Sequence, residues 1–152
     1  MNNTDVIGIK MSIKSFEFSN IEGKRFSKLN EKIMNIKIDH NSTITLISAA
    51  SQNDVLIDFR FTTTFGGVGV VTIEGHIVWG DCEANAVSKS WSTTSQIPNE
   101  MAQEVHSAIL ANCLSEVVML SRDLRLPPPI PIPAINPKDA KGIKPSSGVE
   151  VA

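Results

Sequence analysis

The sequence predicts an α+β domain in which a four-stranded antiparallel sheet is packed by a short helix and a long C-terminal helix. Three features predict this class: apolar and polar residues alternate through the first half of the chain, short connections with glycine separate these segments, and a long apolar helical pattern fills much of the second half. Strands alternate with period two and antiparallel neighbours need only short turns, whereas a helix repeats every three or four residues.

The 152 residues suit one domain with tails. Residues 1–10 are polar and mixed, so we expect a flexible N-terminal extension. Residues 11–134 hold the predicted helices and strands and form the expected domain. Residues 135–152 contain Gly, Ser, Lys and Pro with little to bury, which predicts a disordered tail.

Four segments with alternating polarity predict the strands. They are Ile13 to Phe18, a second segment with Met34, Ile36 and Ile38 at alternate positions, Val55 to Thr62, and Val70 to Trp79. The glycines of Phe65 to Gly69 predict a hairpin turn between the last two. Thr43 to Ile47 either extends the third strand through a bulge or forms a separate strand, and the sequence leaves both open.

Two helices are expected after the strands. Asp81 is a candidate cap for a helix of about ten residues whose Ala84, Val87 and Trp91 share a face. Pro98 suits the first position of a second helix, which continues to Asp123. This long helix is apolar over more of its girth than a sheet covers, so we expect a second subunit on its other side, contacted by Val105, Ile109, Leu114 and Val117.

A proline-rich run follows the long helix, from Leu126 to Pro133. Proline fixes φ and has no N–H, so the run predicts extended polyproline II backbone and the end of the folded body. Its Leu and Ile residues favour a segment strapped across an apolar surface of the domain. Arg125 followed by the prolines also matches the short ligand motif of SH3-type grooves, which is the alternative.

Composition and motifs exclude several functions. A formal charge of −2 gives no basic surface for nucleic acid. No apolar stretch is long enough for a signal peptide or a membrane helix. We therefore expect a cytoplasmic protein without nucleic-acid or membrane partners. Cys82 and Cys113 are far apart and predict free thiols rather than a disulfide or a zinc module.

No residues predict catalysis, a metal site or a cofactor. Gly66-Gly67-x-Gly69 precedes a strand, whereas a phosphate loop precedes a helix. His106 and Cys113 share a helix face, but two ligands do not define a metal site. Glu74 and His76 lie on one strand face, where a solvated polar surface is a simpler interpretation than an acid/base pair. What remains is apolar: Ile36, Ile38 and Val70 suit a groove for extended nonpolar peptide, or equally core or subunit interface.

The order of these segments resembles the SecB export chaperones, and more closely an archaeal SecB-like group. The similarity covers Ile13 to Pro133. The segments that match the family are Ser15 to Asn20, Ile36 to Asp39, Val55 to Thr64, Val68 to Trp79, the long helix from Asn99 to Asp123, and Leu126 to Pro129 after it. None of these motifs is catalytic, and their order carries the resemblance.

The resemblance implies an ATP-independent holdase for unfolded or nascent polypeptides that assembles as a homotetramer, a dimer of dimers. Its client grooves would be lined by Ile36, Ile38, Val70 and Thr72. Glu17 matches one of the sheet acids with which export chaperones dock a motor ATPase, but Val71 stands where another acid is expected. Related chaperones that guard an antitoxin or another aggregation-prone client are therefore the nearer model. A scaffold that binds one folded partner and a small-molecule enzyme with a polar cleft are the alternative classes.

Overall fold

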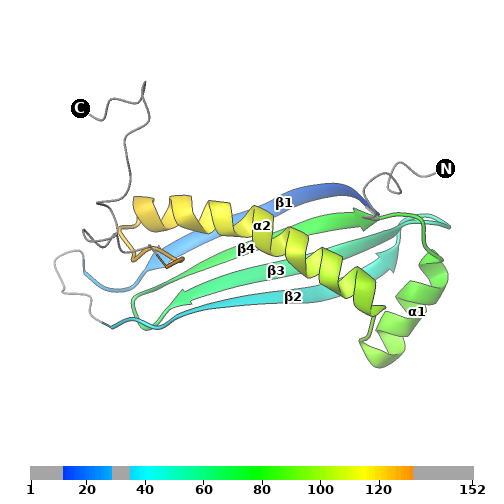
Figure 1. The fold of residues 1–152 in the computed structure, drawn as a ribbon, viewed down its shortest axis with the longest axis horizontal. Coiled ribbons are helices and arrows are strands. Elements are labelled where there is room, and N and C mark those ends of the chain that lie inside the picture. The colour runs from blue at the N-terminus through cyan, green and yellow to red at the C-terminus, as the bar shows by residue number, and fades with distance from the viewer. Residues whose placement is uncertain (1–11, 29–34, 132–152) are drawn as a thin grey trace, which may run out of the picture.

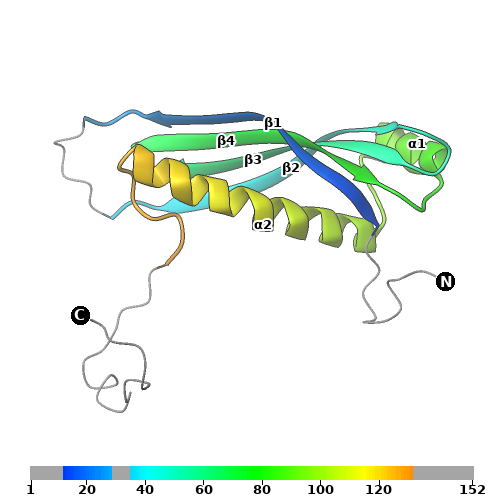
Figure 2. The same ribbon diagram turned by 90° about the horizontal axis from the view of Figure 1, so that it is seen from above.

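The computed structural model describes residues 12–28 and 35–131, which form a four-stranded antiparallel sheet with a long helix along one face and a short helix at one end (Figures 1 and 2). In chain order the elements are β1 (Ile13–Arg25), β2 (Ile38–Ala49), β3 (Val55–Phe65), β4 (Gly69–Trp79), α1 (Ala84–Thr94) and α2 (Asn99–Asp123). This arrangement confirms the predicted fold class. The extension over residues 1–10 and the tail over residues 135–152 lie outside the described residues.

The strand order in the sheet is β1-β4-β3-β2, with every neighbouring pair antiparallel. Strands that follow one another in the sequence, β1 and β2, therefore lie at opposite edges, and the chain between them crosses from one edge to the other. Both edge strands have an outer side that no described strand covers. Outer sides of this kind are the surfaces on which a sheet meets other molecules.

Strand β2 resolves the alternative that the sequence left open. Residues 43–47 belong neither to β3 nor to a separate strand, because β2 pairs with β3 from Ile38 opposite Phe65 to Ala49 opposite Val55. The register shifts between Ile44 and Leu46, where Thr45 is the extra residue of a bulge. The strand predicted to include Met34 begins at Ile38, and Met34 lies outside the described residues.

The core lies between the sheet and α2. Every second residue of β3 and β4 is buried on the side facing the helices, including Ile57, Phe59, Phe61, Ile73 and Ile77. Helix α2 covers them with a stripe in which every fourth residue is buried: Met101, Val105, Ile109, Cys113 and Val117. Each large side chain buried in this way contributes roughly 1.5–3 kcal/mol. The core therefore needs only one side of α2.

Gly75 allows a close approach of the β1 backbone and of the Phe59 ring at the centre of the sheet. A Cβ at this position would lie 2.2 Å from the Glu17 carbonyl oxygen and 2.7 Å from the Phe59 ring. Absence of a side chain there lets Phe59 fill the space, and Phe59 in turn packs on Phe16 with ring centroids 5.1 Å apart. This contact joins β1 to the core and fixes the edge opposite β2.

The helix starts differ from the prediction. Asp81 does not cap α1: its φ is +57° and the N-cap residue is Glu83, which makes no side-chain cap bond. The loop between β2 and β3 replaces the cap, because the Ala84 N–H donates to the Gln52 carbonyl at 3.2 Å. Pro98 stands one position earlier than expected, at the N-cap of α2, and α2 ends at Asp123 as predicted.

Candidate polypeptide-binding surface

The helix-facing side of edge strand β2 carries a row of side chains that we call the β2 strip: Ile36 just before the strand, then Ile38, His40, Ser42 and Ile44. Ile36 and Ile38 are half-buried and pack against the core, and Ile44 is buried within it. Their alternate spacing is that of an extended chain. The strip therefore offers partly exposed apolar side chains in a straight line along an open edge.

A cleft of about 550 Å³ lies at one end of the β2 strip. Its walls come from β2, from the end of α1 and from the start of α2. They mix apolar and polar residues: Ser42, Thr43, Ile44, Trp91, Ser95, Gln96, Ile97, Asn99, Ala102 and His106. The Ser42 hydroxyl and His106 Nδ1 lie 2.7 Å apart, which ties β2 to α2 across the floor. The size of the cleft and the apolar residues among its walls, such as Trp91 and Ile97, suit large side chains of a bound chain.

The proline run closes the other end of the β2 strip. We call its described part, Leu126 to Pro131, the strap. Leu126 is buried and lies against Gly69, and Pro129 is buried further along. His40 Nε2 lies 2.9 Å from the Pro129 carbonyl oxygen, which can only accept, so Nε2 carries the hydrogen. These contacts confirm that the described part of the run packs on an apolar surface of its own domain.

His40 is itself held by the sheet. Its Nδ1 lies 2.8 Å from the Thr63 hydroxyl, and its ring stacks on Phe61 with centroids 5.9 Å apart. In the neutral ring Nδ1 has no hydrogen when Nε2 carries it, so Nδ1 accepts from Thr63. The buried Thr63 therefore sets the orientation in which His40 meets the strap.

The four predicted client-binding residues do not share a surface. Ile36 and Ile38 lie on the helix side of the sheet, within the β2 strip. Val70 and Thr72 lie on the opposite side, because the buried, helix-facing residues of β4 are the alternate ones, such as Val71. One groove cannot be lined by all four, and the structure leaves Ile36 and Ile38 as its candidates.

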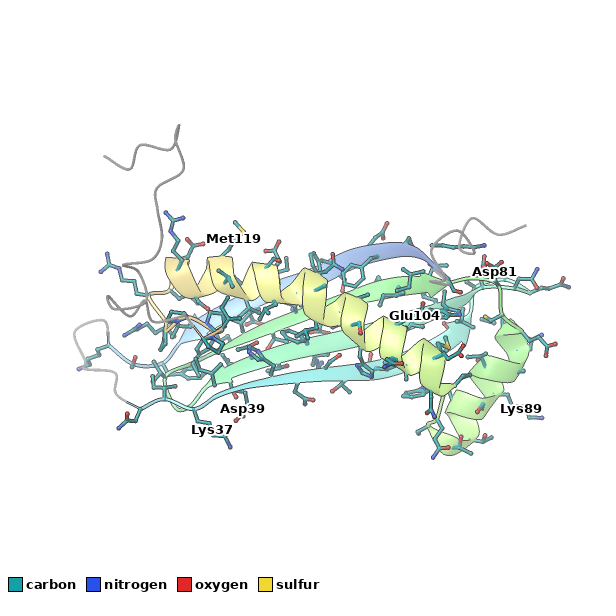
Figure 3. All side chains as sticks on the ribbon, viewed as in Figure 1. Lys37, Asp39, Asp81, Lys89, Glu104 and Met119 are labelled. Carbon is teal, nitrogen blue, oxygen red and sulfur yellow. The ribbon has the colours of Figure 1, made fainter. Side chains whose placement is uncertain are left out.

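The predicted oligomer interface also needs correction. Val105, Ile109 and Val117 have no exposed surface within their own chain, because they form the buried stripe of α2. They have nothing left to offer a partner in this arrangement. Leu114 is half-buried, and beside it the apolar side chains Leu110, Val118 and Met119 are exposed. Met119 points away from the sheet (Figure 3).

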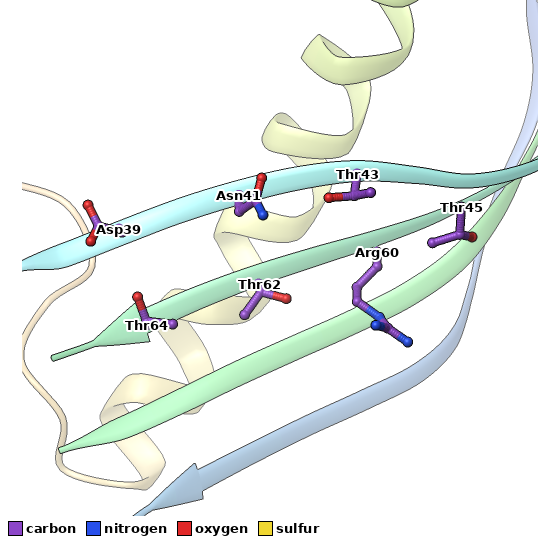
Figure 4. Close-up of a pocket in the computed structure, with 7 residues that line it drawn as sticks. All are labelled: Asp39, Asn41, Thr43, Thr45, Arg60, Thr62 and Thr64. Carbon is purple, nitrogen blue, oxygen red and sulfur yellow. The ribbon is translucent and has the colours of Figure 1, made fainter. Parts of the chain in front are cut away.

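The open face of the sheet, on the side away from α2, is mostly polar. A hollow of about 450 Å³ there is lined by Asp39, Asn41, Thr43, Thr45, Arg60, Thr62 and Thr64 (Figure 4). Glu17 lies exposed on this face, opposite His76, so its place is compatible with the predicted docking role, which stays a prediction. Val71, where a second acid was sought, is fully buried on the other side.

Glu74 and His76 do not form the acid/base pair that their spacing allowed. His76 Nδ1 instead lies 2.6 Å from Asp58, and Glu74 lies 3.6 Å from Arg60. Both pairs run across the strands β3 and β4. Ion pairs as exposed as these contribute at most about 1 kcal/mol each, so they are a solvated polar surface.

His106 and Cys113, the two residues considered for a metal site, lie in different surroundings. His106 bonds to Ser42 at the cleft, whereas Cys113 is buried in the core, where loss of solvent raises the pKa of its thiol to about 12. Residues 12–28 and 35–131 contain no group of three or more His, Cys, Asp or Glu side chains that could hold a metal ion. In the same part of the chain, neither helix is long and apolar enough to span a membrane.

Comparison with solved structures supports the fold of this chain. No family model matches the chain, and neither does any curated protein. Among solved structures, the SecB-like chaperone Rv1957 of Mycobacterium tuberculosis, in complex with a ChAD peptide from the Rv1956 HigA1 antitoxin, superposes with a TM-score of 0.51. The alignment covers 82% of this chain and 86% of that chain, at 10% sequence identity. The fold is SecB-like.

This SecB-like fold places the cleft where sequence reasoning had no candidate. Trp91 was expected only to share a helix face with Ala84 and Val87, His106 was weighed only as a metal ligand, and Ile97 had no assigned role. Their signal is weak because they come from three segments that only the fold brings together. Assignment to an archaeal group of this fold stays a prediction.

Proposed function

We propose that the protein is an ATP-independent molecular chaperone, a holdase that binds extended nonpolar segments of unfolded or nascent proteins along the β2 strip. The observation that supports it most is a SecB-like fold in which α2 covers the centre of the sheet and leaves the β2 edge outside its cover: Ile36 and Ile38 stay half-buried at one end of the β2 strip, and a cleft opens at its other end.

The binding we propose is hydrophobic. An extended client has a side chain on the same side at every second residue, the spacing of Ile36 and Ile38. A buried large side chain contributes roughly 1.5–3 kcal/mol, so a few such contacts give useful affinity without a specific sequence. The cleft beside Trp91 accepts a bulkier residue of the same client.

We also propose a homo-oligomer, arranged as a dimer of dimers, that joins through the outer surface of α2. This outer surface consists of Leu110, Leu114, Val118 and Met119; Leu110, Val118 and Met119 are 44%, 39% and 61% exposed. Exposed apolar side chains gathered on one helix suit a subunit contact. Several strips in one assembly would bind one long client together and raise its overall affinity by avidity.

The proposal includes no catalytic step. The polar pairs nearest the strip have structural partners: Ser42 with His106 joins two elements, and His40 with Thr63 supports the strap. The proposal needs neither cofactor nor nucleotide, because release follows when a client segment folds or passes to another protein. We place this activity in the cytoplasm.

A scaffold for one specific partner is the second candidate. The neighbour Rv1957 was solved with a peptide from a single named antitoxin, which favours a dedicated partner as much as a broad clientele. Exposed Glu17 and the polar open face would serve such a folded partner. Saturable binding to one protein, with no affinity for unfolded chains, would support this alternative.

Light scattering of an aggregating model client tests the proposal. Citrate synthase heated above its unfolding temperature should scatter much less with an equal molar amount of the protein present, and should do so without nucleotide. Serum albumin at the same concentration is the control for crowding. Scattering that is as strong with the protein as with albumin would contradict a holdase.

A further inference from the structure

We propose that the strap occupies the Ile38 end of the β2 strip as an internal competitor, which a client must displace to bind along the whole strip. This inference rests on the proposed function, because it names what covers the site before the client arrives. It follows from the path of the strap, from its chemistry and from the way it is attached.

The strap runs across the strands toward β2. Leu126 lies so close to Gly69 of β4 that a Cβ there would be 2.9 Å from Leu126 Cδ2. Gly69 pairs with Phe65 of β3, and Phe65 pairs with Ile38 of β2. Three residues after Leu126, the Pro129 carbonyl accepts a hydrogen bond from His40, the next strip residue after Ile38. A client lying along β2 would therefore meet the strap at Ile38 and His40.

The strap offers the strip what a client would offer. It is a segment of Leu, Ile and Pro that forms neither helix nor strand and bends at Pro129 and Ile130. Pro127, Pro128 and Pro129 have no N–H, so these residues cannot donate to the edge of β2 as an added strand would. Beyond Leu126, the strap is held by buried proline surface and by the hydrogen bond from His40. Contacts of this kind are exchangeable for those of another apolar chain.

The base of the strap is fixed more firmly. The Arg25 side chain donates to the carbonyls of Leu124 at 3.2 Å, Ser27 at 3.0 Å and Lys28 at 3.1 Å, and also to that of Arg125. The Leu126 N–H donates to the Ser121 carbonyl at 2.8 Å, and Arg125 turns the chain with a φ of +53°. Only the segment after Leu126 is therefore free to detach, while the helix end and the core stay intact.

With competition of this kind, the apparent affinity for a client equals the affinity of the open protein multiplied by the fraction of molecules whose strap is open. Glycine in place of Pro128 and Pro129 gives the detached strap more conformational freedom at both positions and removes the buried ring of Pro129, yet keeps the carbonyl that His40 binds. Both effects favour the open state. For two such residues we expect the client dissociation constant to fall about fivefold.

The test compares full-length proteins that differ only in prolines. Fluorescence anisotropy of labelled, reduced and carboxymethylated α-lactalbumin, which stays unfolded, gives the dissociation constant. The variant P128G/P129G should bind this client about fivefold more tightly than the original protein. The variant P137G/P145G, with the same change outside the strap, should bind as the original does. Equal or weaker binding by P128G/P129G would overturn the proposal, since the strap would then be part of the site.

A second measurement separates this inference from the proposed function. A dye that responds to its surroundings is attached at Ile130→Cys, a position 43% exposed, in a Cys82→Ser background. Saturating client should shift its emission toward that of the dye in water. Client binding without any shift would overturn the strap as competitor and leave the holdase standing. Failure of every variant to bind the client would remove the proposed function, and this inference with it.

Discussion

Replacement of Ile38 by Asp is expected to abolish the suppression of client aggregation while the protein stays folded and assembled. Ile38 is half-buried on the helix side of an edge strand, so a carboxylate there reaches water but places a charge where an apolar client side chain would lie. Desolvating that charge costs several kcal/mol, which exceeds the roughly 1.5–3 kcal/mol gained from one buried side chain. Light scattering of heated citrate synthase measures the loss.

The matched control is Thr45→Asp. Thr45 lies on the same strand and receives the same charge, but it lines the hollow on the open face of the sheet (Figure 4). We expect this variant to suppress aggregation like the original protein. Circular dichroism and solution mass should be unchanged for both variants. If a folded Ile38→Asp protein kept full activity, the client-binding site would lie somewhere other than the β2 strip.

The double substitution Val118→Asp/Met119→Asp is expected to break the assembly into smaller units. These side chains are 39% and 61% exposed in the single chain, so charging them costs the fold little. At a subunit contact the same carboxylates would be buried against apolar surface, and two charges on each subunit would be desolvated. Multi-angle light scattering after gel filtration should show the mass fall from that of a tetramer to that of a dimer or monomer.

Asn85→Asp/Ser92→Asp provides the control for added charge. Both residues are exposed on α1, away from the outer surface of α2, and the mass should stay that of the original assembly. A stable melting temperature in both variants excludes unfolding as the cause. An unchanged mass for the α2 variant would place the subunit contact elsewhere, and a monomeric original protein would remove the oligomer altogether.

The sequence predicted the fold class because local patterns determine most of it. Alternation in Val55 to Phe65 marks both faces of β3. The breadth of the apolar pattern in the long helix predicted more apolar surface than a sheet covers. It did not show which apolar residues of α2 face inward. Val105 and Ile109 look no different from Leu110 or Val118 by residue type, and only the side of α2 that packs on the sheet separates them.

The site was less predictable because it depends on register and on distant contacts. Val70 and Val71 are adjacent and both apolar, so alternation alone did not decide which of them faces the helices. The bulge at Thr45 shifts the register of β2, and polarity does not reveal it. His40 and Pro129 are 89 residues apart, and no local pattern links them. Ile36 and Ile38 lie on one side of the sheet as their local period predicted, and their role in client binding stays a prediction.

Isoleucine methyl NMR with an unfolded client tests the central claim most directly. Protein labelled at isoleucine δ1 methyls is titrated with spin-labelled, carboxymethylated α-lactalbumin. We predict strong broadening of Ile36, Ile38 and Ile97, at the β2 strip and its cleft, while the signal of Ile21, which is 41% exposed on β1, stays sharp. Broadening at Ile21 with none at Ile36 and Ile38 would contradict the account.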